Sequence, residues 1–134
     1  MQSPSIGASY DPAWCGIEAD IMECFKEGKF TCGNIMGGYG TQIREEGRIQ
    51  DIPLKQTADG FHRFGLYWSE TEYIFYCDGE IVSRASKDVS QIPEFILLTT
   101  EVQGYRRNDP VKVGDKFIDD AFIVDYVRAF DEVK

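Results

Sequence analysis

The chain has 134 residues, 43% of them hydrophobic and 28% charged, which is enough to bury the core of one domain. It carries 23 acidic and 14 basic residues, for a formal net charge of −9. This balance argues against nucleic-acid binding, because contact with phosphates requires a basic face. No segment approaches the ~20 apolar residues of a membrane-spanning helix. We therefore expect one domain over residues 1–134 that binds neither nucleic acid nor membrane.

Short β-rich segments alternate with turn signals, and helical periodicity is hard to find. Asp78 and Gly79 predict a type I′ hairpin turn. Residues 37–60 are expected to form a long loop or a meander with weak strands, and residues 104–116 a second charged loop. The pattern is that of an all-β antiparallel sandwich. In chain order, we expect strands at residues 16–24, 30–35, 62–68, 73–77, 80–85, 94–102 and 121–130.

Residues 18–23, with the sequence EADIME, place three carboxylates within six positions. Glu18 and Asp20 project from the same face of a strand, whereas Glu23 would point to the opposite face. A single β-bulge between Asp20 and Glu23 would bring all three onto one face. The carboxyl groups of Glu18 and Glu23 could then approach the ~5–5.5 Å separation of retaining glycosidases. Taken alone, the same spacing occurs on many solvated strands and helix starts.

Other segments make this pattern more specific, and from about residue 10 to residue 131 the chain resembles glycoside hydrolase family 16, the laminarinase and lichenase-like β-glucanases. EADIME resembles the family signature Glu-(Ile/Leu)-Asp-Ile-x-Glu in its bulged form. The resemblance implies a concanavalin A-like jelly roll. Four later segments of this chain resemble later strands of the family: DGFHRFGLYW at 59–68, YIFYCDGE at 73–80, PEFILL at 93–98 and VDYVR at 124–128.

By this resemblance, Glu18 is the nucleophile, Glu23 the general acid/base, and Asp20 the acid between them. The implied activity is that of a retaining endo-β-glucan hydrolase that cleaves β-1,3 or mixed β-1,3/1,4 linkages, with a polysaccharide substrate and neither cofactor nor metal. Repulsion from Glu18 would raise the pKa of Glu23 and keep it protonated. Two alternatives stay open: a non-catalytic glucan-binding or scaffold domain, and an inactive fragment of a larger glycosidase.

Four further residues are candidates for substrate binding. Trp14 can stack on a sugar ring, although packing at an interface explains it equally well. Tyr39 matches a family tyrosine beside the cleft. Glu101 and Gln103 fall on one face of an expected strand where relatives place polar groups against the sugar, a pattern that any half-solvated strand also shows.

Two departures from the family pattern concern the acid strand and the segment that follows it. Ala19 stands where the family has Ile or Leu, a loss of core volume that costs about 2–4 kcal/mol if nothing refills it. The family sequence Asn-x-His-Trp-Gly-Gly-Tyr is replaced by NIMGGY at 34–39, which lacks both the His and the Trp. Substrate binding near Met36 is therefore in question.

The resemblance begins at the acid strand, so the N-terminal half of the family domain has no counterpart in this sequence. We expect a sandwich truncated at its N-terminus, with an exposed strand edge that an assembly partner completes. The expected assembly is a homo-oligomer formed through sheet edges or strand exchange; a self-contained small sandwich is the alternative. The family implies a secreted or periplasmic protein, although residues 1–16 do not resemble a signal peptide.

The four cysteines, Cys15, Cys24, Cys32 and Cys77, show no Cys/His spacing typical of zinc, and we expect them to be reduced in preference to disulfide-bonded. His62 is the only histidine. It lies outside the acid strand, and we expect it to make a structural hydrogen bond within the sandwich instead of acting as an acid or base.

Overall fold

The computed structural model describes residues 1–2, 16–37, 43–100 and 121–131. The chain divides into two compact units, Met1–Leu97 and Leu98–Lys134. All assigned strands belong to the first unit. The described residues of the second unit, 98–100 and 121–131, contain neither helix nor strand.

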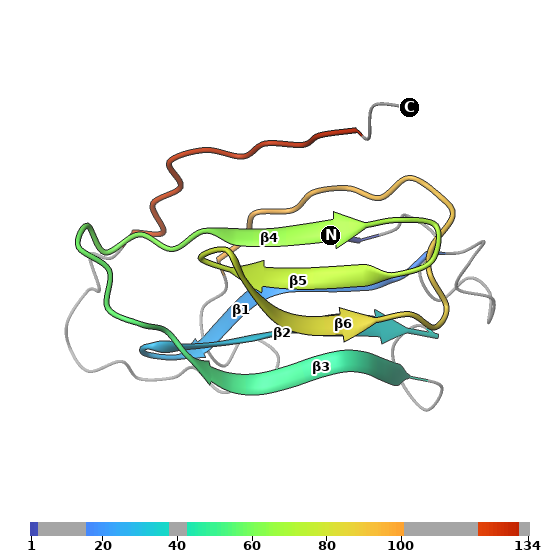
Figure 1. Cartoon of the computed structure of the whole chain (residues 1–134), viewed down its shortest axis with the longest axis horizontal. Coiled ribbons are helices and arrows are strands. Elements are labelled where there is room, and N and C mark those ends of the chain that lie inside the picture. The colour runs from blue at the N-terminus through green and yellow to red at the C-terminus, as the bar shows by residue number, and fades with distance from the viewer. Residues whose placement is uncertain (3–15, 38–42, 101–120, 132–134) are drawn as a thin grey trace, which may run out of the picture. The chain divides into compact units, whose positions relative to one another are not determined.

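The first unit consists of two three-stranded sheets in which every pairing is antiparallel. The sheets lie one over the other in Figure 1, with strand orders β1-β2-β3 and β4-β5-β6. This arrangement confirms the predicted all-β sandwich. No helix in the described residues is long and apolar enough to cross a membrane. The strands are β1 (Glu18–Lys26), β2 (Lys29–Met36), β3 (Arg44–Pro53), β4 (Phe64–Trp68), β5 (Tyr73–Cys77) and β6 (Glu80–Ala85).

The hydrophobic core lies between the two sheets. Alternate residues of a strand point to the same face, so β2 sends Phe30 and Cys32 into the core while β5 sends Tyr73 and Phe75. The rings of Phe30 and Phe64 meet edge to face, with their centroids 5.1 Å apart, and so join the two sheets. The buried cluster comprises Ile17, Ala19, Phe30, Cys32, Met36, Tyr73, Phe75, Ala85 and Val89.

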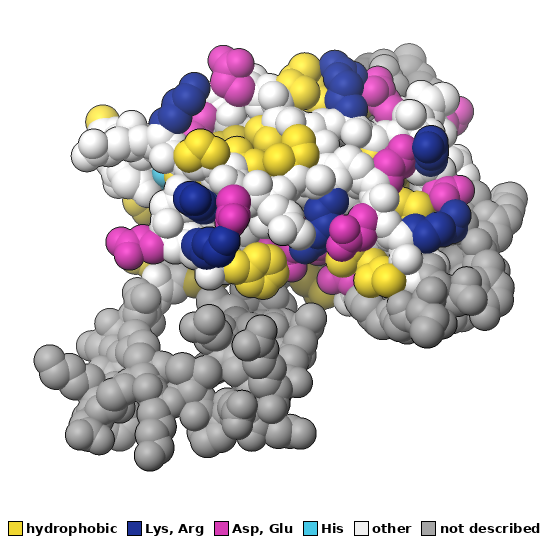
Figure 2. All heavy atoms as spheres, turned by 90° about the horizontal axis from the view of Figure 1, so that it is seen from below, with side chains coloured by type: hydrophobic (Ala, Val, Ile, Leu, Met, Phe, Trp, Pro, Cys, Tyr) yellow, Lys and Arg dark blue, Asp and Glu magenta, His cyan; other side chains and the backbone are white. Residues whose placement is uncertain are grey.

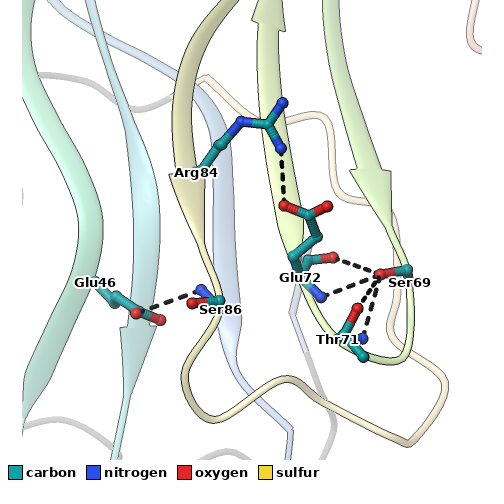
Figure 3. Close-up of polar contacts among 6 residues, drawn as sticks. All are labelled: Glu46, Ser69, Thr71, Glu72, Arg84 and Ser86. Carbon is teal, nitrogen blue, oxygen red and sulfur yellow. Dashed lines mark hydrogen bonds and ion pairs between the residues drawn. The ribbon is translucent and has the colours of Figure 1, made fainter.

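The two strands β5 and β6 have the bounds expected from the sequence, and the turn between them confirms the predicted type I′ hairpin. Asp78 and Gly79 adopt φ values of 52° and 86°, as both central positions of such a turn require. The preceding turn is held by the hydroxyl of Ser69 (Figure 3). That hydroxyl accepts hydrogen bonds from the backbone N–H groups of Thr71 and Glu72, at 3.2 and 3.1 Å.

The strand β3 lies within residues 37–60, for which the sequence analysis left open a long loop or a meander with weak strands; the structure shows the meander, in the order β1-β2-β3. Three of its ten residues are glutamate or aspartate and two are arginine, so alternating hydrophobicity is faint. Its order comes instead from pairing with β2, through a register with two irregularities. Glu46 of β3 also reaches the other sheet, since its carboxylate accepts a 3.4 Å hydrogen bond from the backbone N–H of Ser86 after β6 (Figure 3).

The expected strands at 94–102 and 121–130 are not observed in the described residues. Only Phe95 makes an isolated bridge, to Gln2, and residues 96–100 and 121–131 are irregular. A segment with strand-like composition becomes a strand only where another backbone supplies its hydrogen bonds in a ladder, and neither segment belongs to either of the two described sheets. Predicted residues 101, 102 and the loop at 104–116 lie outside the described part.

Candidate functional site

The three carboxylates of β1 are brought into phase by an irregularity in the strand. Asp20 pairs with Gly33 of β2 and Glu23 pairs with Thr31, so the register shifts between the two acids. The step from Asp20 to Glu23 covers three positions on β1, whereas the matching step from Gly33 to Thr31 covers two on β2. The strand β1 therefore holds one extra residue, as in a β-bulge. The bulge lies at the predicted position.

The acid-bearing face of β1 points away from the core. Ile17 and Ala19 are fully buried in the core, and Glu18 and Asp20 alternate with them. Beyond the bulge, Glu23 pairs with Thr31, which belongs to the same outer face as Gly33 because β2 sends its alternate residues into the core. The sandwich thus separates a dry inner face of this sheet from a polar outer face.

Arg48 of β3 joins two of the three acids. Its Nη1 donates a 2.9 Å hydrogen bond to Oδ2 of Asp20, and its Nη2 donates a 2.8 Å bond to Oε2 of Glu23. Its Nε lies 3.3 Å from Oε1 of Glu45. The side chains of Arg48 and Asp20 are only 12% and 9% exposed, so solvent screens the ion pair between them less than it screens an exposed pair.

Gly33 makes room for this arginine. A Cβ atom at position 33 would lie 2.4 Å from Cα of Arg48, closer than side chains and backbone approach in folded proteins. The φ angle of Gly33 is 144°, a conformation that residues with a side chain rarely adopt. Because Gly33 also pairs with Asp20, its missing side chain is what lets β3 bring Arg48 against the acids.

Asp20 is a carboxyl group with a strongly raised pKa. Burial raises its pKa from 3.8 to about 7, and repulsion from Glu23 and Glu18 acts in the same direction, while the hydrogen bond from Arg48 opposes it. Asp20 therefore exchanges a proton near neutral pH. A carboxyl of this kind can donate a hydrogen bond to a neighbouring carboxylate when protonated and accept one from Arg48 when ionised.

A pocket of about 460 Å³ opens beside this cluster. Glu45, which contacts Arg48, is one of its lining residues, and Met36 is another. Five of the six residues that line the pocket are charged, so they offer hydrogen-bonding groups to a polar ligand. It is lined by Met36, Arg44, Glu45, Glu46, Lys87 and Asp88.

The other predicted site residues are not brought to this cluster by the described structure. Trp14, Tyr39, Glu101 and Gln103 lie outside the described residues, as does Cys15. The remaining cysteines, Cys24, Cys32 and Cys77, are free thiols, as expected.

His62 makes the structural hydrogen bond that the sequence analysis favoured. Its Nδ1 lies 2.8 Å from Oδ2 of Asp78, at the hairpin between β5 and β6. It therefore belongs to the sheet that does not carry the acids.

Arg48 and Glu45 were missed by sequence reasoning. Both fall in the segment expected to be a long loop or a meander with weak strands, and an arginine among glutamates is typical of a solvated surface. The sequence offered one indirect signal for such a residue. Buried carboxylates are costly unless a cationic side chain pairs with them, so a cluster of acids predicts a cationic partner.

The face of the molecule seen in Figure 2 carries charges of both signs. Figure 2 shows lysine and arginine side chains interspersed with aspartate and glutamate, and hydrophobic side chains between them. On this face of the described part, positive charge does not gather into the patch that a phosphate backbone would require.

The fold and the acid cluster define an antiparallel β-sandwich that carries three carboxyl groups on the outer face of one sheet. The model of the family described as glycosyl hydrolases family 16 matches residues 26–116, more than half of the chain. The chain belongs to this family, whose members include β-glucan hydrolases and are typically extracellular. Comparisons with curated proteins and with solved structures gave no match.

Proposed function

We propose that this protein is a retaining endo-β-glucan hydrolase that cleaves β-1,3 or mixed β-1,3/1,4 linkages. One observation carries the proposal: the bulge in β1 that re-phases Glu23 relative to Glu18 and Asp20. A pair of carboxyl groups on one surface is what double displacement at an anomeric carbon requires. The family match begins at residue 26, after the three acids, so their roles depend on this geometry and on the resemblance of residues 18–23 to the family signature.

In the proposed mechanism, Glu18 attacks the anomeric carbon as a carboxylate while Glu23 protonates the departing glycosidic oxygen. The bond from carbon to that oxygen breaks as the Glu18 ester forms. Glu23, now ionised, then removes a proton from water, and the resulting attack releases the sugar with its original anomeric configuration.

Asp20 would serve as the group that adjusts the charge on Glu18. Its pKa of about 7 allows it to hold a proton at mildly acidic pH. A protonated Asp20 can donate a hydrogen bond to Glu18 as the ester breaks and negative charge returns to that carboxylate.

A non-catalytic glucan-binding domain is the second candidate, and Arg48 is the observation that favours it. A guanidinium 2.8 Å from Oε2 of Glu23 stabilises the ionised carboxylate, whereas a general acid must carry a proton. Catalysis by Glu23 therefore requires that Arg48 move or that substrate displace it. If Arg48 stays in place, the acid cluster acts only as a hydrogen-bonding surface for sugar hydroxyls.

The partners proposed for the chain are a polysaccharide and a second copy of itself. Long apolar side chains are exposed in residues 95–98 and again in residues 122–130, including Phe95 at 61% and Ile123 at 69%. Exposed apolar segments of this length are typical of association surfaces, so we propose a homo-oligomer formed through exposed edges or strand exchange. For its location we propose the secreted or periplasmic compartment usual for the family.

The function is tested by release of reducing sugar from laminarin and lichenan. Wild-type protein is compared with Glu18→Gln and with Glu80→Gln, a matched change at an exposed carboxylate of β6. We expect Glu18→Gln to lose at least about 10³-fold in turnover, because the nucleophile is removed, while Glu80→Gln retains activity. Proton NMR of the first product should show the retained β-anomer.

Two results would decide against this reading. Equal activity of wild type and Glu18→Gln would show that Glu18 is not the nucleophile. Absence of turnover from every protein, together with equal retention of wild type and Glu18→Gln on insoluble glucan, would instead establish the glucan-binding alternative.

A further inference from the structure

A second cluster of chemically reactive side chains lies on the sheet that does not carry the acids. It comprises His62, just before β4, Cys77 at the end of β5, and Asp78 in the following turn. One ligand atom from each, a ring nitrogen, a thiol sulfur and a carboxylate oxygen, lies within 4.8 Å of the other two. The proposed hydrolase mechanism uses none of the three.

The hairpin fixes the carboxyl group of this cluster. Oδ1 of Asp78 accepts a 2.8 Å hydrogen bond from the backbone N–H of Arg63, and the backbone N–H of Asp78 donates a 2.8 Å bond to the carbonyl of Arg63. These bonds connect the turn to the residues just before β4, which include His62. The adjacent pairing of Phe64 with Cys77 sets the thiol beside the same carboxylate.

The remaining oxygen of Asp78 is the point on which the other two groups converge. Oδ2 lies 2.8 Å from Nδ1 of His62 and 3.7 Å from Sγ of Cys77. Tetrahedral zinc bonds of 2.0–2.3 Å place neighbouring ligand atoms about 3.3–3.6 Å apart. The sulfur–oxygen separation already falls close to this range, and the nitrogen–oxygen separation needs to open by only about 0.5 Å.

The charges of the cluster also suit a divalent cation. A thiolate and a carboxylate together carry two negative charges, and a neutral imidazole adds none, so a dication gives a neutral site. The side chains are partly exposed, 15% for His62 and 35% for Asp78, which leaves solvent access for a fourth ligand. Three protein ligands with a water in the fourth position is an arrangement common in zinc proteins.

We propose that His62, Cys77 and Asp78 form a binding site for a thiophilic divalent transition-metal ion such as Zn²⁺. When the ion binds, the thiol proton of Cys77 passes to solvent, and the coordinating nitrogen of His62 carries no proton. Oδ2 of Asp78 exchanges its hydrogen bonds for a bond to the metal. The hairpin between β5 and β6 is thereby cross-linked to the start of β4.

Sequence spacing does not reveal this site. Fourteen residues lie between His62 and Cys77, and adjacent Cys and Asp residues match no standard ligand motif. The site exists because antiparallel pairing of β4 and β5 returns the chain to the same place. It is independent of the proposed glycosidase activity, and its test does not require turnover.

The experiment titrates Co²⁺ into the full reduced chain and follows the near-ultraviolet absorption of a thiolate–cobalt bond. We expect a band that saturates at one equivalent, is abolished in Cys77→Ser and persists in Cys24→Ser, a matched change at an exposed thiol of β1. Zn²⁺ should displace the band and raise the melting temperature. His62→Gln, which can still hydrogen-bond to Asp78, should weaken Zn²⁺ binding at least about 10-fold.

Far-ultraviolet circular dichroism establishes whether each variant is folded. If Cys77→Ser does not fold, the Zn²⁺ affinity of His62→Gln provides the test instead. A band that survives in Cys77→Ser, or disappears in Cys24→Ser, would overturn the proposal. So would the absence of both a cobalt band and a Zn²⁺-dependent melting shift in the wild-type protein. Equal Zn²⁺ affinity of wild type and His62→Gln would also contradict it.

Discussion

Asp20 is the residue whose ionisation links the candidate site to the stability of the fold. Its pKa of about 7 in the folded protein exceeds the ordinary value of 3.8. Between these values the native state holds a proton that the unfolded chain has released, so the free energy of unfolding falls as pH rises from about 4 to about 7. The fall is about 1.4 kcal/mol per pH unit for one fully titrating group, and it ends above pH 7.

Asp20→Asn removes this titration, because an amide takes up no proton in the window. We expect urea unfolding of the variant, measured at a series of pH values, to give a flatter profile than the wild type. Burial also raises the pKa of Glu94, so a weaker slope of the same sign remains. Glu27→Gln, in the exposed turn after β1, controls for the loss of one negative charge; a slope for Asp20→Asn as steep as that of this control would contradict the assignment.

At the scale of elements, the contact between β2 and β3 depends on the absence of a side chain at Gly33. A Cβ there would meet the backbone of Arg48 at 2.4 Å, and φ is 144°. We expect Gly33→Ala to lower the free energy of unfolding by at least about 2 kcal/mol, since strain in φ and a steric clash add together. Chemical denaturation measures this difference.

Gly65→Ala in β4 is the matched control for that substitution. Its new Cβ would lie 3.7 Å from Cβ of Tyr76, an ordinary van der Waals contact, and the change should cost less than about 1 kcal/mol. Similar losses in the two variants would show that the approach of Arg48 to Gly33 does not limit stability.

At the scale of the whole molecule, we expect the exposed apolar segments to govern association. Phe95 to Leu98 are each at least 48% exposed, and Phe130 is 84% exposed. Because burying such surface is favourable, we expect the wild-type protein to sediment as a homo-oligomer whose fraction rises with concentration. Ile123→Lys should shift the distribution toward monomer, since a charge would have to be buried in the interface.

Phe61→Lys serves as the control for this measurement, because Phe61 is 46% exposed and lies outside both segments. It should leave the distribution unchanged. A wild-type protein that remains monomeric across the concentration range, or an equal response to both substitutions, would argue against association through residues 122–130.

Much of the candidate site could be anticipated from local sequence, but its charge balance could not. The phase of Glu18, Asp20 and Glu23 depends on alternation within one strand and on one bulge, and the bulge was predicted where it occurs. The partner of these acids, Arg48, comes from a segment for which the sequence analysis left open a loop or a weak strand. Its position depends on two irregularities in the β2–β3 register, which are set by packing across the sheet.

The sequence by itself determined the all-β class, the hairpin at Asp78 and Gly79, and the bulged acid strand, because alternation and turn chemistry act between residues that are neighbours in the chain. Only the tertiary structure decided which segments found a pairing partner. It made β3 a strand, gave the described residues 121–131 no strand, and assembled His62, Cys77 and Asp78 beside one hairpin. The physical reason is that a strand and a side-chain cluster both require groups distant in sequence to meet, and composition does not specify which groups those are.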